Sequence, residues 1–355
     1  MLNELSNVAA LIDAEIENDG FPSTVLPEYL RQAVADYPRR GGKRLRPALL
    51  LWSCGLLDGE IDHAIAAATA VEIYHNWTLV HDDIIDNDDV RRGVPTTHIQ
   101  AAGYAGKELG ADKAAADKFG RDFAVLTGDI QQGWAINMLL KSTERGVSMP
   151  VTLALCRRMQ ELVNRELISG EALDVEFALR GWRNISTEEV MRMLYLKTGA
   201  LLRFCAEAGA VIALNTHDFS EPEVAALGEF ASSAGIAFQL RDDWLGIFGD
   251  FDKLGKGIGA DLVEAKPTVL LLKTFELLGE LERKKLESLI GLPEYAAAQI
   301  EEMRQLMRNS GAEKFVLAKS ADLSAHARSI LLKFEDNRYR QFLLDLNDYL
   351  VSREK

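Results

Sequence analysis

The chain has 355 residues, of which 48% are hydrophobic and 26% charged, and its formal net charge is -14. This acidic balance argues against nucleic acid as a partner, because binding nucleic acid needs a basic surface. The three cysteines are far apart and indicate reduced thiols of a cytoplasmic protein. The N-terminus has no signal-peptide pattern, and no uncharged apolar run approaches the ~18 residues of a membrane span, so we expect no stable membrane insertion.

Helix-favouring residues dominate long stretches of the chain, and alternating strand patterns are scarce. The first expected helix opens at Pro47, and Ser186 with Glu189 forms a capping-box pattern that opens another. The expected helices, in chain order, cover 61–86, 121–141, 150–180, 187–199, 203–215, 222–248, 268–290, 293–309, 310–320 and 322–352, with a loop at 249–266. We therefore predict an all-α, orthogonal bundle of about a dozen helices that forms a single domain over residues 1–355.

An aspartate cluster ends the apolar run at 61–86. Asp82 and Asp86 are four residues apart, so on a helix their carboxylates share one face. Two carboxylates at this spacing can bind one or two Mg²⁺ ions, which prefer oxygen ligands. A solvated acidic helix end is the alternative, but the helix dipole disfavours negative charge at a C-terminus.

Basic residues flank this cluster on both sides in the sequence. Arg91-Arg92-Gly93 follows it, and the glycine-rich segment Gly41-Gly42-Lys43-Arg44-Leu45-Arg46-Pro47 precedes it. Each segment alone is compatible with ordinary surface residues. Beside a metal site, arginine and lysine side chains favour contacts to phosphate groups.

A second aspartate cluster, Asp242-Asp243, lies 160 residues after the first and is less regular. Its i+4 position holds Gly246 rather than an acid, and Asp250 lies two turns after Asp243. Lys253, Lys256 and Lys266 follow it, and Lys197-Thr198-Gly199 ends the expected helix at 187–199, where a glycine is a common stop signal. Glu171 and Asp174 could face a cavity or lie on a helix surface, and His63, His98 and His217 are expected at the surface or in loops.

Together these segments resemble the motifs of the trans-isoprenyl diphosphate synthases, or polyprenyl synthetases. The resemblance covers roughly residues 40–270 and follows the family's order and spacing. Its motifs are Gly41-Gly42-Lys43-Arg44-x-Arg46-Pro47, Asp82-Asp83-x-x-Asp86 with Arg91-Arg92-Gly93, Gly170-Glu171-x-Leu173-Asp174, Lys197-Thr198-Gly199, Phe238-Gln239-x-x-Asp242-Asp243, Gly255-Lys256 to Asp261, and Lys266-Pro267-Thr268. It implies an isoprenoid-synthase bundle around a central cavity, a homodimer, and condensation of isopentenyl diphosphate with an allylic diphosphate.

The resemblance also implies a role for each matching residue. Asp82 and Asp86 would bind two Mg²⁺ ions and Asp242 a third. The allylic diphosphate would be held by Arg91, Lys197, Lys256 and Lys266, and the diphosphate of isopentenyl diphosphate by Lys43, Arg46, His75 and Arg92. Lys197, Thr198 and Gln239 would be the catalytic residues, with Thr198 and Gln239 beside the allylic carbon. Gly246 in place of the last aspartate of the second motif, and Ala265 before Lys266, depart from the family pattern.

Product length is expected to depend on the residues that precede Asp82 on its helix. One helical turn rises 5.4 Å, about the length of one isoprene unit, so Tyr74, Trp77 and Thr78 would set the pocket depth. Trp77 is the largest of them, and the resemblance then implies geranylgeranyl diphosphate (C20), with farnesyl diphosphate (C15) as the alternative. In another interpretation Trp77 packs into a neighbouring helix without a gating role. A class I terpene cyclase and a non-catalytic synthase subunit are the alternative functions.

Overall fold

The computed structural model describes residues 1–249 and 260–352 of the chain. Almost all of the regular structure in these residues is helical, which confirms the predicted all-α class. The chain divides into two compact units, residues 1–157 with 208–219 and residues 158–207 with 220–355. Two of the three boundaries fall within helices α7 and α10, and the third lies between α10 and α11. The single domain predicted over 1–355 stays a prediction.

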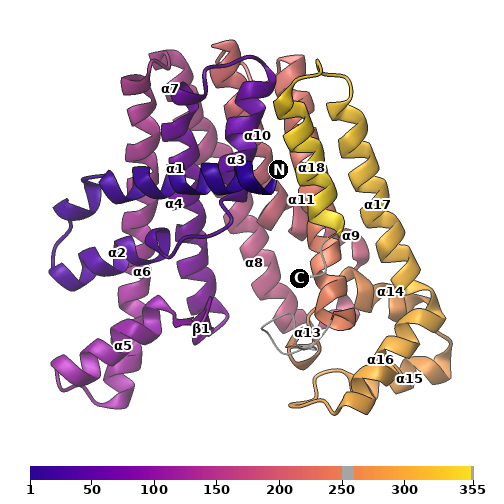
Figure 1. Ribbon diagram of the computed structural model, residues 1–355. Helices are drawn as coiled ribbons and strands as arrows, with labels where there is room; N and C mark the ends of the chain where they lie inside the picture. Colours follow the sequence, from indigo (N-terminus) through magenta and orange to yellow (C-terminus); the bar gives the residue numbers. More distant parts are fainter. Residues whose placement is uncertain (250–259, 353–355) are drawn as a thin grey trace. The chain divides into compact units, whose positions relative to one another are not determined.

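The first unit is built around two long helices, α4 and α6, which lie side by side (Figure 1). Its elements are α1 (Leu2–Asn18), η1 (Phe21–Thr24), α2 (Glu28–Arg39), α3 (Leu45–Leu56), α4 (Ile61–Ile85), the short antiparallel pair β1 (Val90–Arg91) and β2 (Val94–Pro95), α5 (Thr97–Glu108), α6 (Lys113–Leu140), η2 (Lys141–Arg145) and α7 (Met149–Arg158). Small residues let these helices approach closely: a β-carbon at Gly128 of α6 would lie 2.2 Å from the His81 ring of α4. Any larger residue at 128 would force the His81 ring to move.

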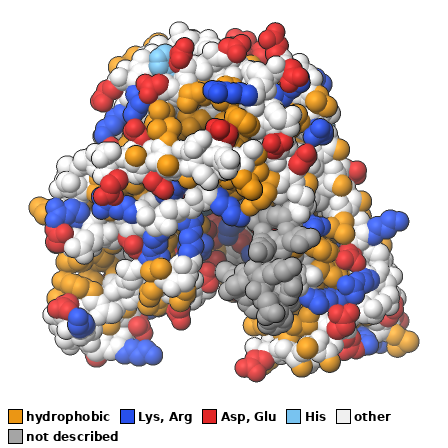
Figure 2. All heavy atoms as spheres, in the orientation of Figure 1, with side chains coloured by type: hydrophobic (Ala, Val, Ile, Leu, Met, Phe, Trp, Pro, Cys, Tyr) orange, Lys and Arg blue, Asp and Glu red, His pale blue; other side chains and the backbone are white. Residues whose placement is uncertain are grey.

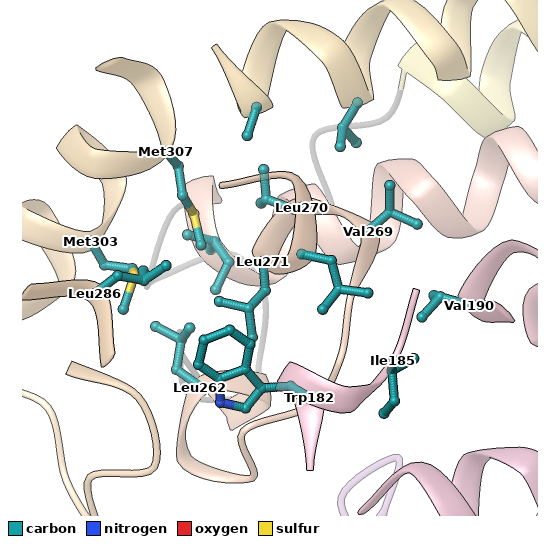
Figure 3. Close-up of a cluster of buried hydrophobic side chains, with 14 of the residues drawn as sticks. Trp182, Ile185, Val190, Leu262, Val269, Leu270, Leu271, Leu286, Met303 and Met307 are labelled. Carbon is teal, nitrogen blue, oxygen red and sulfur yellow. The ribbon is translucent and has the colours of Figure 1, made fainter. Parts of the chain in front are cut away.

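The second unit is held together by one large apolar core. Its elements are η3 (Met159–Asn164), α8 (Arg165–Arg180), η4 (Trp182–Asn184), α9 (Thr187–Leu194), η5 (Tyr195–Gly199), α10 (Ala200–Leu214), α11 (Pro222–Phe248), α13 (Ala260–Val263), α14 (Val269–Leu277), α15 (Glu280–Leu289), α16 (Ala297–Ser310), α17 (Ala312–Leu331) and α18 (Arg338–Ser352). Trp182, Leu262 and Leu271 meet in this core, with Leu286 and Met303 beside them (Figure 3). The predicted capping box at Ser186 and Glu189 is confirmed.

Several predicted boundaries were wrong. Helix α3 begins at Leu45, so Pro47 is its third residue; a proline is tolerated there because the first four N–H groups of a helix have no partner within it. The helix expected to stop at Gly199 continues as a π-helical turn into α10, and Gly199 instead gives room to the Tyr195 ring, 3.2 Å from where its β-carbon would stand. The break expected near 321 falls after Leu331, and the expected helix at 268–290 is interrupted at Gly279.

Candidate active site

The first aspartate cluster ends α4, as the sequence predicted. Asp86 is the residue that caps this helix, and its backbone N–H donates to the carbonyl of Asp82 at 2.8 Å. The backbone between the two residues is therefore helical, and their side chains share one face. Asp82 is half-buried and Asp86 is exposed. This pair offers carboxylate oxygens one helical turn apart.

Asp83, between them in the sequence, has a different environment. Its side chain is fully buried, with Tyr37 of α2 donating a hydrogen bond to Oδ2 and Arg91 of β1 donating through Nε to Oδ1 at 2.5 Å. Burial, reinforced by Asp83, raises the pKa of the Tyr37 phenol. Arg91 also lies 3.6 Å from Asp88. The predicted diphosphate ligand Arg91 is therefore fixed by carboxylates, a role that sequence reasoning missed.

Positive charge gathers around His75, one to two turns before Asp82. Burial lowers the pKa of His75, and Arg46 and Arg92 lower it further, so the imidazole is neutral. Arg92 donates to the carbonyl of Gly41, and a β-carbon at Gly42 would lie 3.1 Å from its guanidinium. Figure 2 shows Lys and Arg side chains gathered around the end of α2. The glycine turn thus brings the two predicted basic segments together.

Arg44 is the exception among these basic residues. Its guanidinium is buried and forms ion pairs with Asp13 of α1 and Glu72 of α4. It is thereby committed to joining three helices, whereas the neighbouring Lys43 is exposed and Arg46 half-buried. The predicted substrate ligands of this segment, Lys43 and Arg46, are placed where a ligand could reach them.

In the second unit, Lys197 and Thr198 lie on the π-helical turn η5. Gly170 of α8 lies against this turn: a β-carbon there would stand 2.5 Å from the backbone nitrogen of Lys197. Lys197 Nζ lies 2.6 Å from Glu171 Oε2 and 2.8 Å from Asp174 Oδ2. The sequence analysis left open whether these two acids face a cavity or lie on a helix surface. In the structure they are half-buried and contact a predicted catalytic lysine. π-Helical turns are frequent at functional sites.

Lys266 approaches the same carboxylate, with Nζ 3.9 Å from Asp174 Oδ2. Burial raises the pKa of Asp174, but the charges of Lys266 and Lys197 outweigh it and the net effect lowers that pKa. The pKa of the half-buried Lys266 is raised, because its acidic neighbours Asp174, Asp261 and Asp243 overcome the cost of removing its charge from water. Two predicted diphosphate ligands thus converge as ammonium groups on one aspartate.

The second aspartate cluster lies near the end of α11. Gln239 donates to Asp243 Oδ1 at 3.2 Å, and burial and the neighbouring Asp261 raise the pKa of Asp243 to about 7. Asp242 beside it is half-buried. A β-carbon at Gly246 would stand 3.2 Å from Asp261 Oδ2, so this acid of α13 lies beside the position where the last aspartate of the motif is missing.

Lys256 and Asp250, both named in the sequence analysis, lie outside the described residues. Within 1–249 and 260–352, no three Asp, Glu, His or Cys side chains come together as a metal site. Among the histidines, His98 was predicted at the surface but is buried at the start of α5, where Thr96 lies against its ring nitrogen at 3.3 Å. All three cysteines are free thiols, as predicted.

The expected product-length residues lie on α4 before Asp82. The Tyr74 ring is buried 4.8 Å from the ring of Trp77, and Trp77 meets His81 edge-on at 5.7 Å. The Thr78 hydroxyl donates to the carbonyl of His75 at 2.7 Å. Trp77 therefore lies within an aromatic row along α4 that ends beside the aspartate pair.

Comparisons with known proteins agree with these motifs. The Polyprenyl synthetase family matches residues 27–307. A short chain isoprenyl diphosphate synthase of Methanothermobacter thermautotrophicus is 31% identical over 94% of this chain and 93% of its own, and a geranylfarnesyl diphosphate synthase of Aeropyrum pernix is 32% identical over 94% and 96%.

No helix among the described residues is long and apolar enough to cross a membrane.

Solved structures give the same result for the fold. A geranylgeranyl pyrophosphate synthetase from Pyrococcus horikoshii superposes with a TM-score of 0.83 at 28% identity, over 99% of this chain and 98% of that one. A geranylgeranyl pyrophosphate synthase from Corynebacterium glutamicum, complexed with isoprenyl diphosphate and magnesium, has a TM-score of 0.84 at 25% identity, and each chain is covered over 99%. The chain belongs to the polyprenyl synthetase family of prenyltransferases.

Proposed function

We propose that this prenyltransferase condenses isopentenyl diphosphate with an allylic diphosphate, and that its main product is geranylgeranyl diphosphate. One observation carries the proposal: the Asp82 and Asp86 pair ends the same helix on which His75 is surrounded by arginines. A carboxylate pair for metal and a cationic environment for anions therefore occur within two turns of one helix. A reaction between two substrates that each carry a diphosphate needs both the metal ligands and the cationic residues.

Magnesium fits the oxygen donors of this chain. Tyr37 and Arg91 hold Asp83 in the interior, whereas Asp82 is half-buried and Asp86 exposed, and a hard cation prefers carboxylate oxygens. We propose that these two residues and Asp242 would hold three Mg²⁺ ions, with diphosphate oxygens and water as the other ligands. Bound there, magnesium would stabilise the negative charge of the departing diphosphate.

The chain's own residues would perform the remaining work. Lys197 and Lys266, with Arg91 and Lys256, would bind the allylic diphosphate, and Lys43, Arg46, His75 and Arg92 would bind the second diphosphate. The allylic C–O bond breaks, and Thr198 and Gln239 would direct their oxygen atoms at the resulting cation. The double bond of isopentenyl diphosphate then forms the new C–C bond, and a proton passes to the departing diphosphate.

The aromatic row on α4 supports the proposed product length. Trp77 and Tyr74 occupy the turns before Asp82, so a growing chain that follows α4 would meet the large Trp77 ring first. Farnesyl diphosphate (C15) is the alternative product. It is one isoprene unit shorter than the C20 product, so a slightly shallower pocket would stop the chain there.

We also propose that the chain forms a single catalytic domain and acts as a homodimer in the cytoplasm. Helix α6 exposes apolar side chains, including Val125, Leu126 and Leu140, that a second copy would cover. Leu126→Asp should then shift the sedimentation coefficient from dimer to monomer at micromolar concentration. A wild-type monomer at that concentration would contradict the proposal.

The decisive assay uses radiolabelled isopentenyl diphosphate with magnesium and dimethylallyl, geranyl or farnesyl diphosphate as primer. Incorporation of label into a C20 product supports the proposal, and the chromatogram gives the product length directly. Consumption of the allylic substrate without isopentenyl diphosphate would instead indicate a terpene cyclase. No turnover with any primer would indicate a non-catalytic subunit.

A further inference from the structure

We propose that Tyr37 is a positioning residue of the reaction: through the buried carboxylate of Asp83 it fixes the guanidinium of Arg91 for the allylic diphosphate. The inference rests on the proposed function, and it assigns work to Tyr37 and Asp83, which neither bind substrate nor hold metal in that proposal. The three residues come from α2, α4 and β1. All three belong to the first unit.

The contacts form one unbroken chain. The Tyr37 side chain is 2% exposed, and its hydroxyl donates to Asp83 Oδ2 while it accepts the backbone N–H of Thr97 at 3.4 Å. Asp83 Oδ1 accepts from Arg91, whose Nε and Nη2 both lie 2.5 Å away. Each oxygen of Asp83 therefore has its own partner, and the phenol and the guanidinium are held on opposite sides of one carboxylate.

Asp83 is the stronger of the two anchors of Arg91. Its contact to Arg91 uses two guanidinium nitrogens, whereas Asp88 lies 3.6 Å away and is about one-third exposed. Both nitrogens contact the same oxygen, Oδ1, so this contact fixes the position of that edge of the guanidinium. The side chain of Arg91 keeps 24% of its surface exposed, and its Nη1 takes no part in that contact.

Loss of the Tyr37 hydroxyl would therefore act on Arg91. Oδ2 of Asp83 has no exposure to water and would lose its donor, and a buried carboxylate oxygen without a donor is unfavourable. The carboxylate would rotate to satisfy Oδ2, and the guanidinium plane would rotate with it. Asp82 and Asp86 lie on another face of α4, so the metal ligands themselves would stay in place.

The test compares Tyr37→Phe with the matched control Tyr29→Phe, which lies on the same helix and whose ring stacks on Tyr104 at 4.7 Å. For Tyr37→Phe we expect the KM for geranyl diphosphate to rise about tenfold while the KM for isopentenyl diphosphate changes less than about twofold. Tyr29→Phe should change neither. Equal increases in both KM values, or none, would overturn the proposal.

A double-mutant cycle with Arg91→Lys separates positioning from general loosening. If Tyr37 acts through Arg91, adding Tyr37→Phe to Arg91→Lys should cost less than about twofold more, whereas independent effects would multiply. Asp83→Asn, which keeps the shape but loses the charge, should give the same KM selectivity and covers the case in which Tyr37→Phe does not fold. Multiplicative losses in the double variant would refute the coupling.

Calorimetric binding of inorganic diphosphate with Mg²⁺ tests the same coupling without turnover. Its affinity should fall about fivefold or more in Tyr37→Phe and stay unchanged in Tyr29→Phe. A wild-type protein that binds diphosphate but incorporates no isopentenyl diphosphate would contradict the proposed function. The effect of Tyr37 on diphosphate affinity could still be measured in that protein by calorimetry. Unchanged diphosphate affinity in Tyr37→Phe, in an active enzyme, would contradict the role of Tyr37 alone.

Discussion

The Asp261 carboxylate of α13 lies against Gly246 of α11, where a β-carbon at 246 would stand 3.2 Å from Asp261 Oδ2. The glycine stands where the family pattern has an aspartate, and the structure places another carboxylate beside that position. An acidic side chain from a different helix therefore lies beside this position. Replacing Gly246 by the aspartate of the family pattern would therefore place a second carboxylate beside that of Asp261.

We therefore expect Gly246→Asp to lower both activity and thermal stability. Its carboxylate would lie within a few ångströms of Asp261 and near the buried Asp243, and like charges at such distances repel. Gly246→Asn has the same size without the charge and should be clearly less harmful at pH 8. Melting temperature and kcat measured for both variants test this, and a more active Gly246→Asp would contradict it.

The aspartate pair gives the simplest prediction. Asp82→Ala or Asp86→Ala should lower kcat by about a thousandfold or more, because metal-ion charge stabilisation is worth several kcal/mol. Circular dichroism should show an unchanged helix content, since Asp82 is half-buried and Asp86 exposed. Asp250→Ala should cost much less than Asp242→Ala. Near-normal turnover of either α4 variant with excess Mg²⁺ would contradict the metal assignment.

The order in which the three cysteines react with an alkylating reagent tests their burial and their thiol pKa values. Burial, with a smaller contribution from Glu60, raises the pKa of Cys54 to about 12, so its reactive thiolate is scarce at pH 8. Cys205 is also buried, whereas Cys156 is partly exposed. Iodoacetamide on the native protein should alkylate Cys156 first, and denaturant should equalise all three sites. Peptide mass spectrometry reads the order, and Cys54 reacting before Cys156 would refute it.

Local patterns in the sequence were enough to place some of the site. The spacing of Asp82 and Asp86 and the apolar run before them predicted a helix end with two carboxylates on one face, because helical periodicity is a local property. The capping box at Ser186 was readable for the same reason. Gly199 was misread because a glycine that ends a helix and one that makes room for a ring, here that of Tyr195, look alike in sequence.

Tertiary partners were beyond such reasoning. Tyr37 is 46 residues from Asp83, and Arg44 is 31 from Asp13, so neither pair leaves a periodic signal. Sequence reasoning therefore assigned Arg91 to the diphosphate and placed Arg44 only within a basic segment, without finding the carboxylate partners of either. The two arginines differ in burial: the Arg44 side chain is fully buried between two acids, whereas the Arg91 side chain, which also contacts two acids, keeps 24% of its surface exposed. The partner Tyr37 had no signal of its own.

Product length is the most specific consequence of the aromatic row on α4. Trp77 is 6% exposed and contacts both Tyr74 and His81, so it is part of the fold as well as a candidate plug. Replacing a buried tryptophan by alanine costs about 3–5 kcal/mol. Trp77→Leu is therefore the better first variant, because it opens space while keeping an apolar contact with Tyr74.

If Trp77 limits chain growth, Trp77→Leu should move the product by one or more isoprene units beyond C20, and Trp77→Ala further still. One unit corresponds to about one helical turn of 5.4 Å, so the longer chain would next meet Tyr74. Total incorporation of labelled isopentenyl diphosphate should stay within about threefold of wild type for Trp77→Leu, since the diphosphate ligands are untouched. Thr69→Val, buried on the same helix and outside the expected product-length residues, serves as the control for altered packing. If both Trp77 variants keep the wild-type product spectrum while still folded, the alternative holds: Trp77 packs into its neighbours, and another residue forms the floor of the pocket.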